Sequence, residues 1–323
     1  MIFIYKIDYE KIRENISLLD DSDYIILKSN AYGFGFKEIL EIAIEMGNYK
    51  FAVIDMEYAI YIKSKYPDAI VLLLEPVRNK DLKLCEKHKI EVSINSLDDI
   101  DLLAGYKLNV QIEVNCGMNR FGIRPYDIER AINIINDNNL NLTGIYSHNA
   151  TNDYSLTKNQ LEAFYYAVKH HNNIDIHFAA SSLMKKEINF QTARRIGAFI
   201  YDDALTVYGK IIQINEVYKG ESIGYDFAYQ FKDNAYVGVI DIGYADGLAR
   251  HCDGFLVWVK DRYYPLIGKA CMNYSFVLLD SVNLMDEEVV IIGKNNNIKK
   301  YEIYFDKIPH QIFIDFLKTW RKW

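Results

Sequence analysis

One lysine of this chain ends an apolar run, where its amine could take part in chemistry. Lys28 follows "YIIL" at residues 24–27 and precedes a turn marked by Gly33 and Gly35. Burial disfavours the charged ammonium form, so a lysine held there would have a lowered pKa and a free amine. A free amine can form a Schiff base with a carbonyl compound. The alternative is a lysine whose amine reaches water at the rim of the protein, and the residue taken alone favours this alternative.

Ser181, Arg195 and Gly197 offer a second kind of chemistry, the binding of an anion. Ser181 follows the run "HFAA", and the other two belong to "ARRIG" at residues 193–197. Backbone amides and a hydroxyl at the ends of strands can hold a phosphate group. A tight structural turn is the alternative for Gly197, and the local sequence does not separate the two. An activated lysine and a phosphate seat together indicate a carbonyl cofactor that carries a phosphate, which is pyridoxal phosphate.

A third candidate is the tyrosine in "DIGYADGLA" at residues 241–249. Tyr244 lies between glycines, just after an apolar run, so a loop could present its hydroxyl. A phenol in this position can transfer protons as a general acid or base. The alternative is an aromatic residue of an edge strand, which is the more common role of such a tyrosine.

These candidates must be positioned by a fold, and the first two-thirds of the chain predict a closed barrel. Short apolar runs, separated by stretches with helical spacing, lie at 24–28, 51–54, 70–74, 90–94, 110–114, 142–148, 174–181 and 193–197. Apolar strands that alternate with helices indicate a parallel sheet covered by those helices. Eight such units close a (β/α)8 TIM-type barrel, and an open doubly wound sheet is the alternative.

In such a barrel the active site lies at the carboxyl ends of the strands. The expected strand ends carry polar side chains that are not natural core residues, namely Lys28, Glu113, His148, Ser181, Arg195 and the neighbouring Gly197. We therefore expect several of these residues to converge on one ligand.

The pattern of the sequence changes near residue 205. Apolar runs then succeed one another across glycine turns with few helical stretches, as in "YVGVIDIGYADG" and "EEVVIIGKNN". This pattern predicts an α/β barrel over residues 1–205 and a C-terminal β-rich domain over 206–323. Residues 1–8 also read as a strand, which could return to the second domain.

Composition and charge limit the class of protein. Half of the 323 residues are hydrophobic, and lysine and arginine total 37 against 44 acidic residues. This balance argues against nucleic acid or an anionic membrane as the main partner. No apolar run approaches the ~18–20 residues of a membrane span and the N-terminus lacks a signal-peptide pattern, so we expect a cytoplasmic protein. The cysteines and histidines show no metal-binding spacing, so we expect no metal site.

Several separated motifs together resemble one family, the alanine racemases. In order they are "LKSNAYGFG", "IEVNCGMNRFGI", "IYSHNATND", "FAASSL", "RIGAFIYD", "IGYADG" and "GKACMN", extending from Lys28 to about residue 275. The resemblance implies a barrel joined to a β-domain and a head-to-tail homodimer. It also implies that Lys28 carries pyridoxal phosphate and then acts as base or acid on one face of the substrate Cα. Tyr244 from the other subunit would serve the opposite face.

The same resemblance implies roles for the other site residues. His148 would support Tyr244 by hydrogen bonding, and Arg195 would face the pyridine nitrogen of the cofactor. Arg120 would contact the substrate carboxylate or the cofactor's phenolic oxygen, and Met272 would line the pocket from the other subunit. The phosphate would be held by Tyr32, Ser181 and the backbone amides of Gly197 and Ala198.

The chain departs from the family pattern at several positions. Many members carry a carbamylated lysine where this chain has Glu113, and a glutamate supplies a permanent carboxylate that could pair with Arg120 bidentately. Phe34 stands where histidine is usual, and Asn273 where aspartate is usual. His310 falls near the place of a phosphate-touching tyrosine. Because the segment between residues 244 and 272 is also short, these changes leave the substrate side chain open.

The expected function is a pyridoxal-phosphate-dependent racemase of alanine, which would supply D-alanine for cell-wall building. A racemase of serine or another amino acid is the nearest alternative. A second alternative is a pyridoxal-phosphate-binding protein without turnover, but such proteins resemble a barrel alone and lack the tyrosine of "GYADG". A third is a barrel aldolase that uses Lys28 on a sugar phosphate, and this alternative leaves Tyr244 unexplained.

Overall fold

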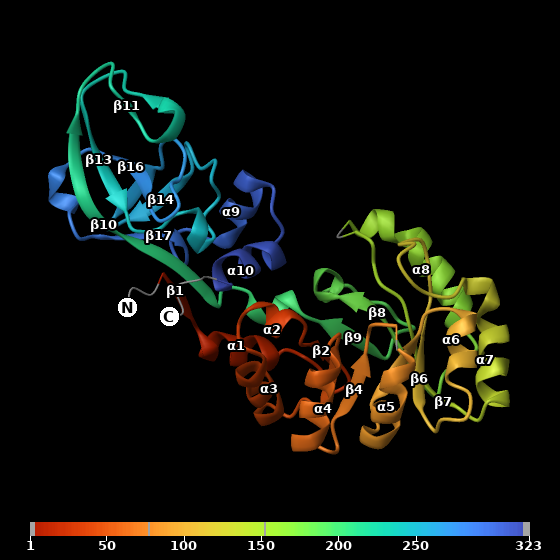
Figure 1. Cartoon of the computed structure of the whole chain (residues 1–323). Coiled ribbons are helices and arrows are strands. Elements are labelled where there is room, and N and C mark those ends of the chain that lie inside the picture. Colours follow the sequence, from red (N-terminus) through yellow and green to blue (C-terminus); the bar gives the residue numbers. More distant parts are fainter. Residues whose placement is uncertain (1–3, 77, 152, 319–323) are drawn as a thin grey trace. The chain divides into compact units, whose positions relative to one another are not determined.

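The computed structural model describes residues 4–76, 78–151 and 153–318 (Figure 1). The chain divides into two compact units. The barrel unit, as we call it, consists of residues 13–31 and 35–200, and the sheet unit of the described parts of 1–12, 32–34 and 201–323. Among the described helices, none is both long and apolar enough to cross a membrane.

Eight parallel strands close the barrel. In order around it they are β2 (Tyr24–Ile26), β3 (Lys50–Val53), β4 (Ile70–Leu73), β5 (Glu91–Ile94), β6 (Asn109–Glu113), β7 (Asn141–Tyr146), β8 (Asp175–Ala180) and β9 (Ala193–Ile196). The last strand pairs with the first, with Tyr24 opposite Arg195 and Ile25 opposite Ile196. The predicted (β/α)8 barrel is therefore confirmed, and the open doubly wound alternative is wrong.

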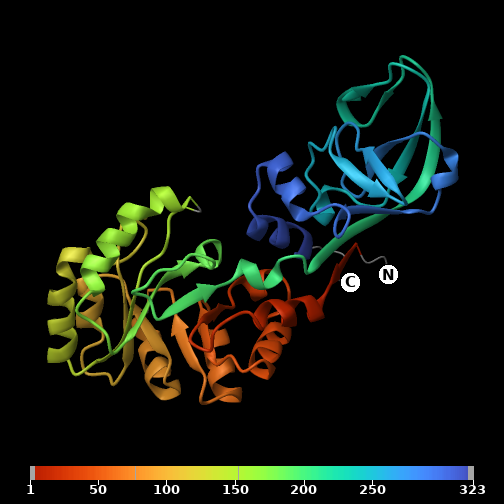
Figure 2. The same ribbon diagram turned by 180° about the vertical axis from the view of Figure 1, so that it is seen from behind.

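Helix α1 precedes the first barrel strand and the other helices of this part follow strands, and the two opposite views place α3 to α8 outside the barrel (Figures 1 and 2). Their bounds are α1 (Tyr9–Ile16), α3 (Phe36–Glu45), α4 (Met56–Lys65), α5 (Leu82–His88), α6 (Leu97–Leu102), α7 (Ile128–Asp137) and α8 (Tyr154–Val168). Helix α3 shows why they form, because its buried residues Phe36, Ile39 and Leu40 recur at helical spacing. Helix α6 begins with a capping box between Ser96 and Asp99, which satisfies backbone amides at its start.

The C-terminal part of the chain forms the antiparallel sheet unit. Its seven-stranded sheet has the order β15-β14-β17-β10-β13-β16, and β1 pairs with β10. The bounds are β1 (Tyr5–Ile7), β10 (Leu205–Val217), β13 (Ala235–Ile240), β14 (Leu256–Val259), β15 (Arg262–Pro265), β16 (Ser275–Leu279) and β17 (Glu288–Ile292). A separate two-stranded sheet pairs β11 (Ser222–Ile223) with β12 (Tyr229–Gln230). The predicted β-rich C-terminal domain is confirmed.

Two helices close this unit, α9 (Ile298–Phe305) and α10 (Pro309–Leu317), and the sequence analysis does not predict them. Pro309 occupies the first turn of α10, where the missing amide proton costs nothing. The helix buries Phe313 and Phe316 among its apolar residues. Short apolar runs near the chain end therefore form helices, although the preceding pattern is that of strands.

Residues 32–34 belong to the sheet unit, although they come after strand β2 of the barrel in the chain. The ring of Phe34 is buried and stacks on Tyr201, with ring centroids 4.2 Å apart. A Cβ atom on Gly33 would lie 2.6 Å from Cβ of Leu317, so only glycine fits there. The phenylalanine that replaces the family's usual histidine is thus a packing residue of an aromatic cluster.

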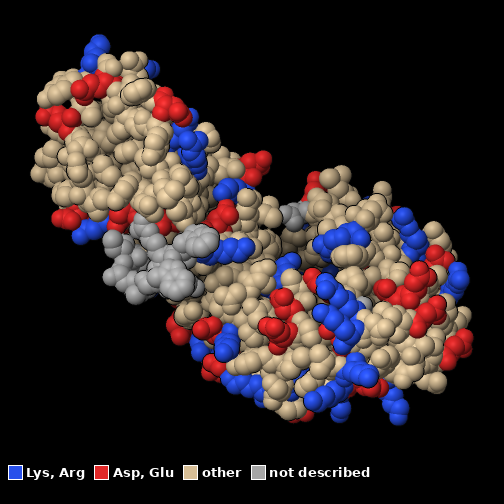
Figure 3. Space-filling model, viewed as in Figure 1, with Lys and Arg blue, Asp and Glu red and all other residues tan. Residues whose placement is uncertain are grey.

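Acidic and basic side chains are interspersed over the visible surface of each unit (Figure 3). The whole chain carries a formal net charge of −7.

Candidate active site

Lys28 lies directly after strand β2, at the carboxyl end where a barrel builds its active site. Burial lowers the pKa of its amine, and the positive charges of Arg120 and Arg195 lower it further. The ammonium form is disfavoured by desolvation and by like charge alike. The position therefore favours a free amine, which is the form that attacks a carbonyl carbon.

A left-handed turn comes directly after the lysine. The φ angles of residues 29–32 lie between 52° and 56°, and none of these residues is glycine. Left-handed backbone costs L-residues roughly 1–2 kcal/mol each, so contacts must hold the turn. Asn30 supplies two of them, because its side-chain oxygen accepts from the amide of Phe36 at 2.8 Å and its carbonyl accepts from the amide of Gly35 at 3.1 Å. This turn fixes where the chain leaves β2, and hence the position of Lys28.

Ser181 and Gly197 come together at the ends of β8 and β9. The hydroxyl oxygen of Ser181 accepts from the amide of Gly197 at 3.0 Å and from the amide of Phe199 at 3.2 Å. Ala198 lies between these two amides in the chain. Ser181 is the acceptor in both of these bonds, so its own hydroxyl proton can be donated to an anion. The amides of Gly197 and Phe199 are used by Ser181 in this structure, so the hydroxyl is the donor that fits a phosphate group here, and the roles of the Gly197 and Ala198 amides stay predictions.

Arg195 is buried and held on several sides. Its Nη1 donates to Nδ1 of His177 at 2.8 Å and to the carbonyl of His177 at 2.9 Å. Its Nη2 donates to the carbonyl of Ser147 and lies 3.4 Å from Nδ1 of His148. The guanidinium carbon also lies 4.9 Å from the centre of the Tyr146 ring, a cation–π distance. A buried arginine with this many partners has one orientation.

Glu113 is also buried, at the end of β6. Burial raises the pKa of its carboxyl group, while Arg195, Arg120 and the hydroxyl of Tyr146 act in the opposite direction. The hydroxyl of Tyr146 donates to the carboxylate at 3.2 Å. Within the described residues Glu113 makes no ion pair with Arg120, whose exposed guanidinium lies 5.8 Å from the ring of Phe121. The bidentate pairing of Glu113 with Arg120 therefore stays a prediction.

Tyr244 and Met272 lie together in the sheet unit. The amide of Tyr244 donates to the carbonyl of Cys271 at 3.0 Å, and the amide of Ala245 donates to the carbonyl of Met272 at 2.9 Å. Asp246 closes the same turn by accepting from the amide of Gly243 at 2.9 Å. The two loops are therefore held together, and they present the side chains of Tyr244 and Met272 to solvent.

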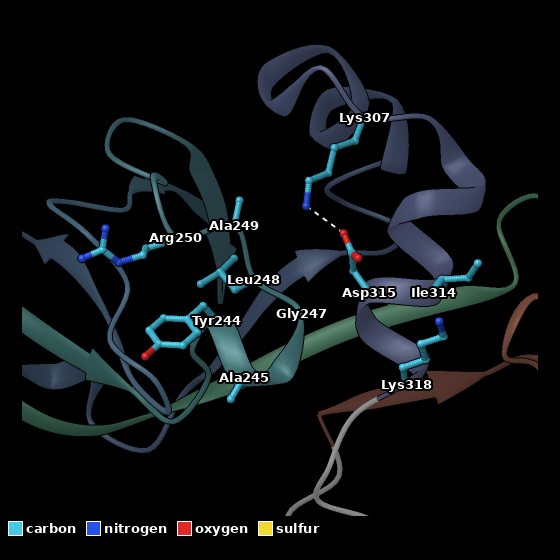
Figure 4. A pocket seen from close by; sticks show the side chains of 10 residues that line it. All are labelled: Tyr244, Ala245, Gly247, Leu248, Ala249, Arg250, Lys307, Ile314, Asp315 and Lys318. Atoms are coloured by element: carbon cyan, nitrogen blue, oxygen red, sulfur yellow. Dashed lines mark hydrogen bonds and ion pairs between the residues drawn. The ribbon is translucent and has the colours of Figure 1, made fainter.

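Tyr244 borders a pocket of about 440 Å³ in the sheet unit (Figure 4). Lys307 and Asp315 lie across the pocket and form an ion pair at 2.7 Å. The tyrosine hydroxyl points away from this pair, as the close-up shows. The phenol is thus directed outward and not into the interior of its own unit.

Tyr32 and His310 also lie in the sheet unit. The ring of Tyr32 packs against Tyr201 and His310, with centroid distances of 5.5 and 5.1 Å. Burial raises the pKa of the Tyr32 hydroxyl, which therefore stays a hydrogen-bond donor. The roles of Tyr32 and His310 towards a phosphate stay predictions.

Sequence analysis missed three residues that support Arg195 and Glu113, namely Gln111, Tyr146 and His177. All three lie on barrel strands that read as apolar runs. The available signal was a polar or amphipathic residue within such a run, since a buried polar group needs partners. That signal does not say which partner each group finds.

The residues of the barrel unit fit a cofactor with an aldehyde, a ring nitrogen and a phosphate. Lys28 offers an amine with a lowered pKa for the aldehyde, and the hydroxyl of Ser181 offers a donor for the phosphate. Arg195 offers a fixed donor for a ring nitrogen. Pyridoxal phosphate has these three features.

Comparisons with known proteins identify the family. Residues 7–204 match the family model "Alanine racemase, N-terminal domain", and residues 204–321 match "Alanine racemase, C-terminal domain". The alanine racemase of Listeria monocytogenes serotype 4a (strain HCC23) is 32% identical over 326 residues, which cover 90% of this chain and 88% of that protein. The chain belongs to the alanine racemase family.

Solved structures agree in fold. The alanine racemase of E. faecalis has a TM-score of 0.85 at 22% identity, with 98% of this chain and 96% of that chain covered. A histidine racemase of Leuconostoc mesenteroides subsp. sake has a TM-score of 0.80 at 18% identity, with 97% and 95% covered. At these sequence identities the structural similarity supports only the fold.

The family defines the enzyme as a pyridoxal-phosphate-dependent racemase. The family match argues against the two alternatives that are not racemases, namely a pyridoxal-phosphate-binding protein without turnover and a barrel aldolase. The match extends over the C-terminal domain, which barrel-only binding proteins lack, and it leaves no reason to assign the aldolase reaction.

Proposed function

We propose that the enzyme interconverts L- and D-alanine by a two-base mechanism. The observation that carries the proposal is the environment of Lys28, whose pKa is lowered by burial and by two arginines. A two-base racemase needs an amine that can take a proton from Cα at neutral pH, and this environment favours one. The 32% identity to a curated alanine racemase supports alanine as the substrate.

Pyridoxal phosphate, when bound, withdraws electrons from the Cα–H bond of the amino acid. Lys28 then removes or returns the proton on one face of Cα, and Tyr244 does so on the other. Each direction of the reaction uses one group as base and the other as acid. The product differs from the substrate because the proton returns on the opposite face.

Arg195 favours return of the proton once it has been removed. A guanidinium group only donates hydrogen bonds and keeps its protons. If Arg195 faces the ring nitrogen of the cofactor, that nitrogen therefore stays unprotonated. The other contacts of Arg195, to the carbonyls of Ser147 and His177, hold it in place. A weaker electron sink favours quick return of the proton to Cα over side reactions. His148, at 3.4 Å from Arg195, would support Tyr244.

The remaining residues bind and orient. Ser181 and the amides of Gly197 and Ala198 would hold the phosphate together with Tyr32. Arg120 would bind the substrate carboxylate, because an exposed guanidinium beside the lysine can reach a ligand. Glu113 provides a carboxylate that interacts electrostatically with Arg195 and Arg120. Met272 would line the pocket near the substrate side chain.

The proposed enzyme is a homodimer whose sites are shared between subunits. Tyr244 and Met272 project from two loops that backbone hydrogen bonds join, and Tyr274 on the second loop is exposed as well. Phe227 is one of the most exposed large apolar residues of the described chain, and the neighbouring Asp226 is tied to Lys269 by an ion pair at 2.8 Å. Aromatic and methionine side chains gathered on a surface are typical of an interface.

Chiral analysis tests the substrate. The pure protein with added pyridoxal phosphate is incubated with each enantiomer of alanine, and with L-serine, L-lysine, L-ornithine and L-histidine in parallel. Alanine is expected to give the highest kcat/KM. If alanine is the poorest substrate, the enzyme is a racemase of another amino acid, a second candidate that the departures at Asn273 and His310 favour.

Subunit mixing tests the shared site. Lys28→Ala and Tyr244→Phe proteins are each expected to be inactive in racemisation. Mixing them should restore about one competent site per heterodimer, because one site then receives both a lysine and a tyrosine. No recovery after verified subunit exchange would place both groups in one chain. Supply of D-alanine to the cell wall, and a cytoplasmic location, stay predictions.

A further inference from the structure

A chain of hydrogen bonds runs through the inside of the barrel and ends at Arg195. Barrel interiors are usually filled by branched apolar side chains. Here Gln111 on β6 and His177 on β8 are both fully buried. Nε2 of His177 lies 2.7 Å from Oε1 of Gln111, and its Nδ1 lies 2.8 Å from Nη1 of Arg195. The histidine therefore joins the glutamine to the arginine.

The arginine end sets the direction of these hydrogen bonds. A guanidinium group can only donate, so Nδ1 of His177 must be the accepting, unprotonated nitrogen. Burial, together with the charges of Arg195 and Lys50, lowers the pKa of His177 well below its usual value, so the ring is neutral. A neutral ring with a bare Nδ1 carries its proton on Nε2. That proton needs an acceptor.

The Gln111 end of these hydrogen bonds gives the same donor–acceptor direction independently. Both protons of the Gln111 amide are used, by Glu91 at 2.5 Å and by the Tyr24 hydroxyl oxygen at 3.0 Å. Tyr24 in turn donates to Asp175 at 2.7 Å, and Lys50 donates to the same carboxylate. The amide oxygen of Gln111 is then left to face His177. Every donor in the chain meets an acceptor.

Stacking holds the ring of His177 in this orientation. The ring lies between Tyr24 and Tyr146, with centroid distances of 4.9 and 5.1 Å and interplanar angles of 19° and 17°. A tilt of the ring out of this plane would break both stacks, and a 180° flip within the plane would lose the hydrogen bonds to Arg195 and Gln111. The His177 ring therefore keeps its position, so a change in its NMR signals reflects a change in its hydrogen bonds.

We propose that Gln111 is a positioning residue: oriented by Glu91 and Tyr24, it keeps the proton of His177 on Nε2 and so holds Arg195 in place for the cofactor. The effect on the cofactor rests on the proposed function, since it requires Arg195 to face the ring nitrogen. The state of His177 does not rest on it.

The first measurement uses the cofactor-free, full-length protein. Nitrogen NMR of labelled histidine, with the His177 signals assigned by a His177→Asn variant, distinguishes the two ring nitrogens. We expect a bare Nδ1 and a protonated Nε2 in the wild-type protein. A proton on Nδ1, or a doubly protonated ring near neutral pH, would overturn the proposal whatever the enzyme's activity.

Two variants of the glutamine then test its role. Gln111→Met has a similar length but removes the acceptor. The Nε2 proton of His177 then loses its hydrogen bond, so the Nε2 signal should shift although Arg195 still keeps Nδ1 bare. The affinity for pyridoxal phosphate should fall about ten- to hundredfold. Gln160→Met, a buried glutamine on α8 outside the chain of bonds, should change neither. An unchanged His177 signal and unchanged affinity in Gln111→Met would overturn the proposal.

Gln111→Glu supplies a rescue that depends on pH. When protonated, the new carboxyl can donate to Glu91 and still accept from His177, so binding should approach that of the wild type. When ionised it faces the carboxylates Glu91 and Asp175, with Lys50, Tyr24, His177 and Arg195 as the other titratable or charged groups around it. It then favours a doubly protonated His177, which can no longer accept from Arg195. We expect cofactor affinity to fall as pH rises, and a flat profile equal to that of Gln111→Met would contradict the proposal.

The proposed function and the positioning role of Gln111 can be contradicted separately. If wild-type protein does not take up pyridoxal phosphate, the proposed function fails, while the NMR result still decides the tautomer. If the wild type binds and racemises normally but Gln111→Met alters only thermal stability, Gln111 is structural and the positioning role is wrong.

Discussion

The barrel unit and the sheet unit hold their candidate site residues in opposite ways. In the barrel unit Arg195 is 5% exposed and Glu113 is 6% exposed, and each has hydrogen-bond partners inside its own unit. In the sheet unit Tyr244 is 40% exposed and Met272 is 56% exposed, and among the described residues only their backbones have hydrogen-bond partners. The barrel unit thus encloses Arg195 and Glu113, whereas the sheet unit displays Tyr244 and Met272, although its Tyr32 is buried and Arg120 of the barrel unit is exposed.

This difference separates two kinds of task. Buried groups can have shifted pKa values and fixed orientations, because low polarity strengthens each electrostatic contact. Exposed groups can reach something outside their own unit. The barrel unit is suited to holding a cofactor, and the displayed turn is suited to completing a site from elsewhere.

Removing the lysine should have the largest effect. Lys28→Ala loses both the amine that holds the cofactor and one of the two proton-transfer groups. We expect racemisation to fall by at least about 10⁴-fold, measured by chiral chromatography. Lys107→Ala, an exposed lysine of the same unit, is the control and should keep normal activity. Substantial activity in Lys28→Ala would remove the barrel unit from the chemistry.

Removing the phenol should have an unequal effect. Tyr244→Phe keeps the ring but loses the proton, so Cα proton exchange from one enantiomer should fall about 10²–10⁴-fold and exchange from the other much less. Exchange into deuterated water, with detection by mass spectrometry, measures each direction. Tyr274→Phe, on the same exposed surface, should be close to wild type. Equal losses from both enantiomers in a well-folded protein would argue against opposed bases.

Disturbing the displayed turn should affect the sheet unit alone. A Cβ atom on Gly243 would lie 2.4 Å from the carbonyl oxygens of Cys271 and Met272, so Gly243→Ala must shift this backbone. We expect a loss of about 1–3 kcal/mol in unfolding free energy and reduced racemisation, with cofactor binding largely retained. Denaturant unfolding and the absorbance of bound cofactor measure the two properties. Loss of cofactor binding together with activity would contradict the separation of tasks.

Changing one charge near the lysine should have the smallest effect. Arg120 lowers the pKa of Lys28, so Arg120→Met should raise that pKa, and the effect should be small because the arginine is exposed. The amine is free above its pKa, so the pH midpoint for cofactor uptake by the cofactor-free protein should move upward. Arg124→Met, another exposed arginine nearby, is the control. A midpoint that does not move, or that moves equally in both variants, would contradict the electrostatic coupling.

Much of the fold could be predicted from local patterns. The apolar runs match all eight barrel strands, because strands buried on both faces leave a clear signal in the sequence. Helices α9 and α10 were missed, since short apolar stretches near the end of a β-rich region do not distinguish helix from strand. Phe34 shows another limit, because only its stack on Tyr201 explains the departure from the family pattern.

The positions of the candidate site residues could be predicted better than the interactions that these residues make. Lys28, Ser181 and Arg195 each lie in or directly after an apolar run, so their place at one edge of the barrel results from the topology. The partners of Arg195 could not be predicted, because His177 and Gln111 lie 18 and 84 residues away from it along the chain. Hydrogen bonds across a barrel depend on strand order and register, which local residue patterns do not contain.

By itself, the sequence determined the barrel, the β-rich domain, the motifs of the family and the residue types at the strand ends. Only the tertiary structure decided that residues 32–34 pack in the sheet unit, that Arg195 is enclosed and that Tyr244 is displayed. The physical reason is that a side chain's pKa and hydrogen bonds depend on the water and charges removed or brought near it in space. Residues far apart in the chain supply most of that environment.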